Sequence, residues 1–135
     1  MSQDTTLIFY EKPGCINNKK QAKLLMQSGV KVERRNLQEC EFTVDSLAPF
    51  FKHLPRQQWL NPSAPALKKG AISPEILSDL ELLQAMCDDR LLIRRPLLEY
   101  GERCWAGFDW ESVCEMLDLT YTPVDADLET CVRAR

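Results

Sequence analysis

Residues 9–20, FYEKPGCINNKK, place a cysteine directly after a Pro-Gly pair and before a run of polar, helix-forming residues. The apolar segment before the pair, residues 6–10, is typical of a buried strand in a parallel sheet. After Cys15, helix formers dominate to about Ser28, and Gly29 then supplies a helix stop. This stretch therefore predicts a strand, a tight turn and a helix, with Cys15 at the junction.

Residues 30–37, VKVERRNL, alternate apolar and charged side chains and predict a second strand. Strand, helix and strand with short connections form a βαβ unit, whose crossover is right-handed in nearly all proteins. We expect Ala22, Leu25 and Met26 to supply the buried face of the helix. The first third of the chain is thus predicted to pair two parallel strands.

Residues 40–89 are predicted to form a helical insert, because their composition does not shift as it would in a separate domain. Its first helix is expected to begin at Thr43 and run to about Leu54. Its second helix has Ser73 as its N-cap, with proline at the first helical position, and continues through Met86. Between the two helices, prolines and a glycine favour short turns.

After the insert, residues 97–100 and 103–106 predict two strands joined as a tight hairpin, and Asp109 can cap a last helix through Leu117. The element order is β-α-β, helical insert, β-β-α. We therefore predict an α/β fold with a mixed sheet. A single domain should span residues 1–117, followed by a polar tail over 118–135.

Composition excludes several classes of function. The chain has 135 residues, a net charge of −3 and 44% hydrophobic residues, which suits one soluble domain with a sizeable core. Its mild acidity does not favour direct binding of nucleic acid or of an anionic membrane. The sequence has no apolar run of the roughly 20 residues that a membrane helix needs, and its first residues, MSQDTT, lack an apolar signal core. We expect a cytoplasmic protein.

The chain has six cysteines but a single histidine, His53, and no pair of cysteines at CxxC spacing. This pattern does not favour a structural metal site, so we expect no metal and no bound cofactor. Cytosolic thiols are also kept reduced, so most of these cysteines are expected to be structural. The six are Cys15, Cys40, Cys87, Cys104, Cys114 and Cys131.

Cys15 differs from the others because it is expected to begin a helix. The first turn of a helix exposes unpaired N–H groups and the positive end of the helix dipole, which stabilise a thiolate. Lys19 and Lys20 add positive charge nearby. Cys15 is therefore the predicted nucleophile. The alternative, from the residues alone, is a cysteine that only packs against or caps the helix.

The pattern Y-x-x-P-x-C that ends at Cys15, together with RRPLL at residues 94–98 and GFDWESV at residues 107–113, resembles the arsenate reductase (ArsC-like) family, which includes the Spx regulators. The resemblance covers about residues 7–117. It implies a thioredoxin-like fold with a cis Arg95-Pro96 bond beside the active cysteine.

The resemblance also implies a site. Cys15 and Arg95 would be catalytic, and Arg94, Asn18, Lys19 and Pro96 would bind the substrate or an anion. Glutathione would be a cosubstrate, and glutathione or a glutaredoxin the partner. With FYEKPGCINNKKQ, the segment WLNPSAPALK at residues 59–68 looks most like the branch of nitrogenase-associated proteins, which implies an association with nitrogen fixation.

Three departures from the family bear on function. Asn18 stands where Spx-type relatives have the second cysteine of CxxC, so Cys15 lacks a local resolving thiol. Residues 61–69 offer two lysines and no arginine, and Trp105 stands where a basic residue is expected, so we expect weak arsenate reduction at most. The predicted function is Cys15-based thiol-redox chemistry linked to glutathione or glutaredoxin. The alternative is a non-enzymatic ArsC-fold adaptor or regulator that binds a partner protein.

Overall fold

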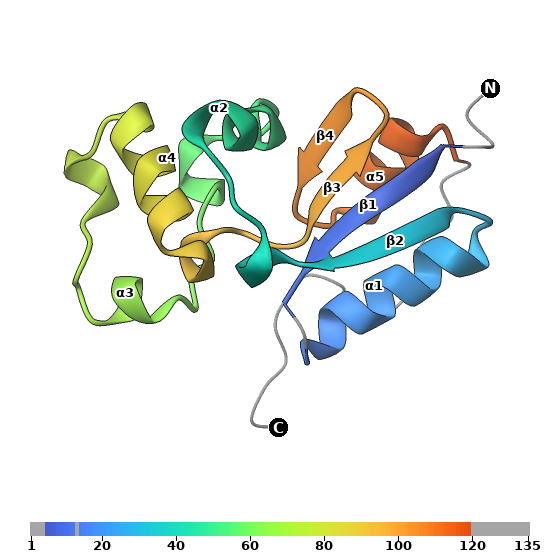
Figure 1. Cartoon of the computed structure of the whole chain (residues 1–135), viewed down its shortest axis with the longest axis horizontal. Helices are drawn as coiled ribbons and strands as arrows, with labels where there is room; N and C mark the ends of the chain where they lie inside the picture. The colour runs from blue at the N-terminus through green and yellow to red at the C-terminus, as the bar shows by residue number, and fades with distance from the viewer. Residues whose placement is uncertain (1–4, 13, 120–135) are drawn as a thin grey trace.

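The computed structural model describes residues 5–12 and 14–119 (Figure 1). Its four strands form one sheet in the order β2-β1-β3-β4. Strand β1 pairs in parallel with β2 and antiparallel with β3, and β3 pairs antiparallel with β4, so the predicted α/β fold with a mixed sheet is confirmed. The strands are β1 (Thr6–Glu11), β2 (Lys31–Asn36), β3 (Leu97–Tyr100) and β4 (Arg103–Ala106).

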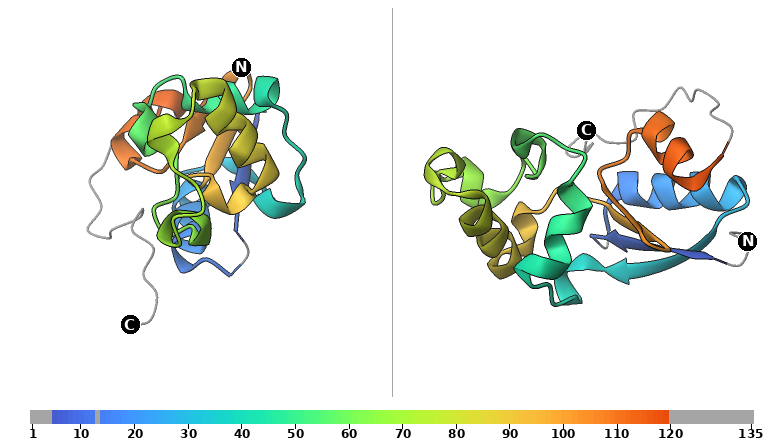
Figure 2. Two further views of the ribbon diagram at one scale, coloured as in Figure 1. Left: turned by 90° about the vertical axis from the view of Figure 1, so that its left-hand side faces the viewer. Right: turned by 90° about the horizontal axis from the view of Figure 1, so that it is seen from above.

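Two helices cover one side of the sheet. Helices α1 (Ile16–Gln27) and α5 (Trp110–Leu117) lie on the same side of the strands (Figure 2). Gly29 follows α1 with a φ of +90°, a backbone conformation that side chains with a Cβ rarely adopt, which explains why the helix stops there. The residues between β2 and β3 extend beyond the carboxyl end of β1 (Figure 1).

This insert consists of short helices, including the stretch between its two predicted helices, where the prolines favoured short turns. Its α-helices are α2 (Val44–Leu47), α3 (Pro65–Lys68) and α4 (Asp79–Asp88). Single 3₁₀ turns connect them to one another and to the strands. These turns are Leu37–Glu39, Ala48–Phe51, Arg56–Gln58, Pro74–Ile76 and Arg90–Leu92.

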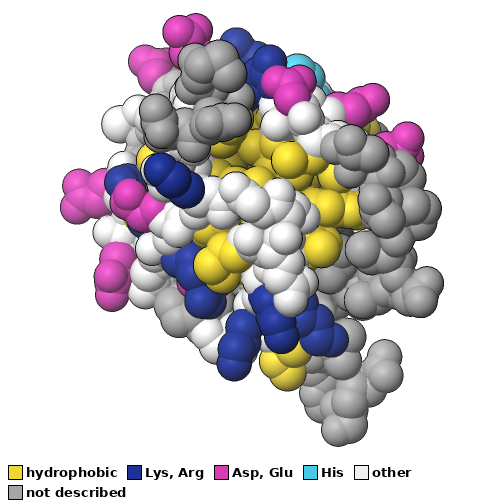
Figure 3. Space-filling view, turned by 90° about the vertical axis from the view of Figure 1, so that its right-hand side faces the viewer, with side chains coloured by type: hydrophobic (Ala, Val, Ile, Leu, Met, Phe, Trp, Pro, Cys, Tyr) yellow, Lys and Arg dark blue, Asp and Glu magenta, His cyan; other side chains and the backbone are white. Residues whose placement is uncertain are grey.

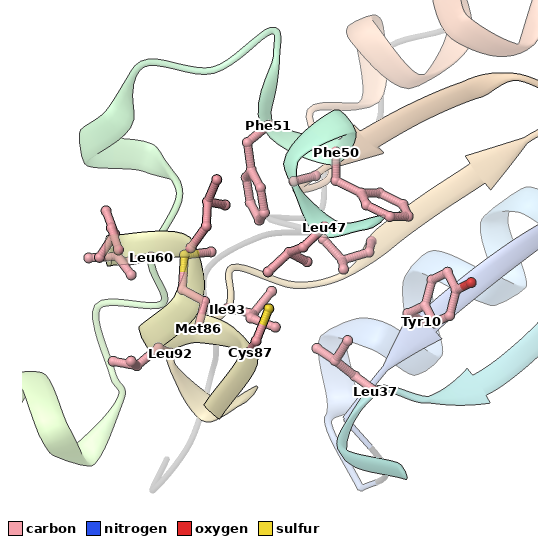
Figure 4. Close-up of a cluster of buried hydrophobic side chains, with 14 of the residues drawn as sticks. Tyr10, Leu37, Leu47, Phe50, Phe51, Leu60, Met86, Cys87, Leu92 and Ile93 are labelled. Carbon is pink, nitrogen blue, oxygen red and sulfur yellow. The ribbon is translucent and has the colours of Figure 1, made fainter. Parts of the chain in front are cut away.

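Strand β1 separates two hydrophobic cores, because successive side chains of a strand point to opposite faces. Leu7 and Phe9 are fully buried in the helix-side core, which contains residues of α1 and α5. Tyr10 is buried in the insert-side core, where Ile8 also packs. Figure 4 shows this second core, in which Tyr10 and Leu37 lie beside side chains from the insert. Packing against Tyr10 therefore joins the insert to the sheet.

The two helices predicted in the insert have different bounds in the structure. The first α-helix, α2, ends at Leu47 and continues only as the 3₁₀ turn Ala48–Phe51, short of Leu54. Pro49 explains the change, since a proline has no N–H to donate to the carbonyl oxygen four residues earlier and so interrupts the α-helical hydrogen-bond pattern.

The second helix begins at Asp79, because Ser78 and not Ser73 is its N-cap. The Ser78 hydroxyl accepts a hydrogen bond from the Glu81 amide, and the Glu81 carboxylate accepts one from the Ser78 amide. This reciprocal capping box is a stronger start signal than a serine followed by proline. Residues 74–76 form only a 3₁₀ turn, and the Ser73 side chain makes no capping bond in this part of the described chain.

The buried face of α1 also differs from the prediction. Ala22 and Leu25 are fully buried, but Met26 is 49% exposed. The other buried positions of this helix are polar: Asn17, Asn18 and Gln21. The amino-terminal half of α1 thus turns carboxamides, and not apolar side chains, toward the protein.

Asp109 occupies the predicted N-cap position of α5, although its carboxylate accepts a hydrogen bond from the Ser112 hydroxyl (2.6 Å) and not from a helix amide. Among the described helices, none has the length and apolar character needed to cross a membrane. On the face at the right-hand side of Figure 1, apolar side chains gather at the centre, and lysine and arginine side chains border them below (Figure 3).

Candidate functional site

The turn before Cys15 is closed by a hydrogen bond from the Cys15 amide to the Lys12 carbonyl oxygen (3.1 Å). Gly14 has a φ of +84° in this turn, which a residue with a side chain would adopt only under strain. Cys15 itself is the N-cap of α1 and has an extended backbone. The predicted strand–turn–helix junction is therefore present, with the half-buried Cys15 side chain at its centre.

The Cys15 side chain forms no capping hydrogen bond in the described chain, and the first turn of α1 contains no acidic residue. The amides of this turn lack helical partners, and the helix dipole adds positive potential. Lys19 and Lys20 lie exposed on the next turn. A thiolate at this position lies at the positive end of the helix, near two exposed lysines.

Burial disfavours the thiolate at four other cysteines. Desolvation raises the pKa of the Cys40, Cys87, Cys104 and Cys114 thiols. At Cys40, the charges of Arg35 and Arg90 oppose this rise without cancelling it. All five of the described cysteines are free thiols. Cys131 lies outside the described residues.

Asn18 ties the turn to the helix. Its Oδ1 accepts a hydrogen bond from the Lys12 amide (3.0 Å), and its Nδ2 donates to Oε1 of Gln21 (2.9 Å). The residue is only 2% exposed. These contacts favour a structural role for Asn18, whereas the sequence predicted that it would bind the substrate.

Asn17 is a residue that the sequence reasoning missed. Its side chain is 3% exposed, and in the described chain neither Oδ1 nor Nδ2 has a hydrogen-bond partner. Buried polar groups are nearly always paired, so this carboxamide is unusual. The available sequence signal was a pair of asparagines, which are weak helix formers, in the first helical turn after a cysteine.

The predicted Arg95-Pro96 bond is cis in the structure. Pro96 precedes Leu97, which pairs with Tyr10 near the carboxyl end of β1, the end from which the Cys15 turn departs. The Pro96 carbonyl oxygen accepts a hydrogen bond from the Gly107 amide (2.9 Å). Nε of Arg95 is buried and has no hydrogen-bond partner among the described residues. The two sequence landmarks thus converge on one end of the sheet.

Arg94 contributes to a different part of the surface. Its amide donates to the Trp59 carbonyl oxygen (3.0 Å), and the residue lines an open pocket of about 650 Å³ between the insert and β4. His53 and Trp105 stack in this pocket, with ring centroids 5.0 Å apart. A neighbouring pocket of about 740 Å³ shares these two rings. At position 105, where the resemblance predicted a basic residue, the Trp105 ring instead stacks on the ring of His53.

In residues 5–12 and 14–119, no three or more histidine, cysteine, aspartate or glutamate side chains gather in a way that could hold a metal ion. The chemistry available at the Cys15 turn is that of a thiol at a helix N-terminus, with two exposed lysines on the next turn.

No protein-family model matches the sequence. The chain is 42% identical over 125 residues to the uncharacterized 15.7 kDa protein in the draG 3′ region of Rhodospirillum rubrum, covering 93% of this chain and 87% of that protein. The chain belongs to the same family as this protein. The name of this relative states no activity.

Several solved structures share the fold. The arsenate reductase of Vibrio cholerae has a TM-score of 0.70 and 21% identity, and covers 83% of this chain and 98% of its own. A putative ArsC family related protein from Bacteroides fragilis has a TM-score of 0.72 and 21% identity, over 82% and 97% of the two chains. A putative arsenate reductase from Yersinia pestis has a TM-score of 0.67 and 25% identity, over 81% and 98%.

These neighbours show that the chain has the ArsC-type fold, which confirms the predicted thioredoxin-like architecture. The resemblance to the ArsC-like family, seen first in the Cys15 and Arg95-Pro96 landmarks, thus agrees with the structure. Its narrower form, the branch of nitrogenase-associated proteins, stays a prediction.

Proposed function

We propose that the protein is an ArsC-type thiol-redox protein in which Cys15 is the nucleophile. The observation that carries this proposal is the position of Cys15 at the N-cap of the twelve-residue helix α1, without a capping bond and without an acidic residue in the first helical turn. Reactive cysteines of redox proteins occupy such positions. Arg95, beside the cis-proline, is the proposed second catalytic residue, and Lys19 adds positive charge near the site.

The proposed step is thiol–disulfide exchange with oxidised glutathione. The Cys15 thiolate attacks one sulfur of the glutathione disulfide, the disulfide bond breaks, and a mixed disulfide between Cys15 and glutathione forms. The second glutathione leaves as a thiolate and takes up a proton from water. Asn18 has no thiol and cannot resolve this mixed disulfide. A glutaredoxin thiol, or the thiol of a further reduced glutathione, would therefore attack the sulfur of the bound glutathione and release Cys15 as a thiolate.

Disulfide exchange is favoured over arsenate reduction. Tight binding of a tetrahedral oxyanion benefits from several guanidinium groups that converge on it. Here Arg94 lines the pocket that contains His53 and Trp105, and Trp105 stacks on His53. This leaves Arg95 as the arginine proposed to face an anion at Cys15. A single arginine binds a tetrahedral oxyanion more weakly than several converging guanidinium groups do.

An association with nitrogen fixation is part of the proposal. It is supported by the resemblance of residues 9–21 and 59–68 to nitrogenase-associated proteins. The name of the R. rubrum relative, which refers to the draG 3′ region, is a second and looser support.

The proposal is tested by incubating the reduced protein with oxidised glutathione and mapping adducts by mass spectrometry of peptides. We expect the first glutathione adduct at Cys15, its removal by glutaredoxin, and no such adduct in Cys15→Ser. The matched control is Cys104→Ser, which removes another half-buried thiol and should leave the Cys15 adduct in place. A wild-type protein that forms its adduct elsewhere, or none, would contradict the proposal.

One observation favours the second candidate, an adaptor that binds a partner protein through the same turn. Ile16 directly follows Cys15, and its apolar side chain is 56% exposed. An exposed large apolar side chain beside the reactive position suits contact with another protein. If the adaptor is correct, Ile16→Glu should abolish partner binding while Cys15→Ser preserves it. If the redox proposal is correct, Cys15→Ser should abolish thiol–disulfide exchange with glutathione.

A further inference from the structure

The carboxamide of Asn17 carries an unused donor and an unused acceptor inside the protein. Its side chain is 97% buried, and within the described chain both Nδ2 and Oδ1 lack hydrogen-bond partners. The neighbouring Asn18 is buried to the same extent, but both of its polar ends are bonded. An unpaired buried polar group destabilises a folded protein, so a native structure that retains one calls for a reason.

The position of Asn17 connects this carboxamide to Cys15. Asn17 is the second residue of α1, and Cys15 is the N-cap. Side chains of a helix lean toward its amino terminus, which here is the Cys15 turn. Asn18 demonstrates this direction, because its Oδ1 reaches back to the Lys12 amide in that turn. The exposed Ile16 and the half-buried Cys15 keep this end of the helix close to solvent.

The pairing of one donor with one acceptor restricts the chemistry of a ligand. At neutral pH arsenate carries hydroxyl donors besides its ionised oxygens, so it could bond to both atoms of Asn17, but burying its charge beside a neutral carboxamide costs more free energy than burying a neutral group. A peptide group offers an N–H and a C=O, and can satisfy both atoms of a carboxamide. The unpaired atoms therefore favour a ligand that contains a peptide bond over an arsenate-like anion.

We infer that Asn17 is a substrate-binding residue, which pairs with a peptide group of a small cysteine-derived disulfide while that disulfide exchanges with Cys15. This inference rests on the proposed function and specifies its substrate class. The Cys15 thiolate attacks the near sulfur of the disulfide, the S–S bond breaks, and the departing half leaves as a thiolate that takes a proton from water. Asn17 is neither oxidised nor reduced. Its bonds hold the retained half of the substrate in place.

The test compares two neutral disulfides that differ in their peptide groups. The first is the disulfide of N-acetylcysteine methylamide, and the second is diethyl disulfide, which has no hydrogen-bonding donor group. Rates of adduct formation at Cys15 are measured for the wild type, for Asn17→Leu and for Gln27→Leu. The last variant is a matched control, since it removes an exposed carboxamide at the far end of the same helix.

We expect the wild type and Gln27→Leu to react faster with the amide disulfide than with the other disulfide. In Asn17→Leu the ratio of these two rates should fall by about tenfold, as the loss of one or two hydrogen bonds predicts. An equal ratio of the two rates in the wild type and in Asn17→Leu would overturn the inference.

A second measurement separates this inference from the proposed function, because it needs no reaction at Cys15. N-acetyl-S-methylcysteine methylamide carries the peptide groups but cannot exchange. It should shift the Asn17 side-chain NH₂ resonance in an NMR titration, whereas ethyl methyl sulfide, which has no hydrogen-bonding donor group, should not. No shift would overturn the role of Asn17, even if Cys15 exchanges with disulfides. A shift without any Cys15 adduct would overturn the proposed redox function and support peptide binding.

Discussion

The backbone amide of Lys12 donates a 3.0 Å hydrogen bond to Oδ1 of Asn18, so the residue that follows β1 is tied directly to the first turn of α1. Asn18 occupies the position at which Spx-type relatives would have the second cysteine of CxxC. In this protein the position closes the turn around Cys15 and cannot resolve a disulfide. Asn18 thus fixes the shape of the turn and, under the proposed function, leaves the resolution of a Cys15 disulfide to an external thiol.

Asn18→Ala should destabilise the protein by about 1–3 kcal/mol, because it leaves the Lys12 amide without its acceptor. Urea denaturation measures the change. Gln27→Ala is the control, since this side chain is exposed and its removal should change the stability by less than about 0.5 kcal/mol. Equal stability of the two variants would show that the Asn18 bonds contribute nothing to folding.

Asn17→Leu should raise the free energy of unfolding by about 1 kcal/mol, because it removes two unpaired polar atoms from a buried site and replaces asparagine with a better helix former. The midpoint of urea denaturation should rise. A substantial loss of stability would mean that the Asn17 carboxamide is already satisfied inside the protein, and would weaken its proposed role in binding.

Arg34→Ala should destabilise the protein by about 2–3 kcal/mol. Arg34 donates two hydrogen bonds, of 2.8 and 3.0 Å, to the carboxylate of Glu11, which is only 8% exposed and would be left charged and unpaired. Arg35→Ala is the matched control, because the Arg35–Glu33 pair lies exposed on the same strand and should contribute little. Comparable losses in the two variants would contradict this distinction.

Alkaline stability should depend on Tyr10. Burial, followed by the charge of Glu99 and the hydrogen bond to it, raises the pKa of Tyr10 to about 12 from 10.0. The unfolded chain then ionises first, so the stabilisation is complete below pH 10 and is lost as the pH rises toward 12. The loss should be on the order of 2 kcal/mol.

Tyr10→Phe removes this titration while keeping the ring that packs edge-on against Phe42 and Phe50. The difference in unfolding free energy between wild type and variant should therefore shrink between pH 10 and 12. A difference that is constant over this range would show that Tyr10 has an ordinary pKa.

Limiting iodoacetamide at pH 7 should label Cys15 before Cys40, Cys87, Cys104 and Cys114. Burial raises the pKa of the latter four thiols, so their thiolate fraction is small at neutral pH and their labelling should increase as the pH rises above 9. Peptide mapping after quenching measures the order. Preferential labelling of any of these four at pH 7 would contradict the assignment of Cys15 as the nucleophile.

Much of the fold follows from signals that act over a few residues. The apolar run before residue 11, the glycines at positions 14 and 29, and the alternation in residues 30–37 predicted β1, the Cys15 turn, α1 and β2, and the structure has all four. The N-cap of α4 did not follow from local signals alone. Ser73 and Ser78 are both suitable N-caps, and only the reciprocal bonds with Glu81 select Ser78.

The amino-acid sequence by itself determined the elements around Cys15, since turn conformation and helix termination depend on neighbouring residues. Tertiary structure alone decided which side of α1 is buried, and therefore that Asn17 is unpaired while Asn18 is bonded. It also brought together His53 and Trp105 from distant segments. The physical reason is that burial and hydrogen-bond pairing depend on which surfaces meet when the sheet, its helices and the insert pack, and no local pattern encodes that contact.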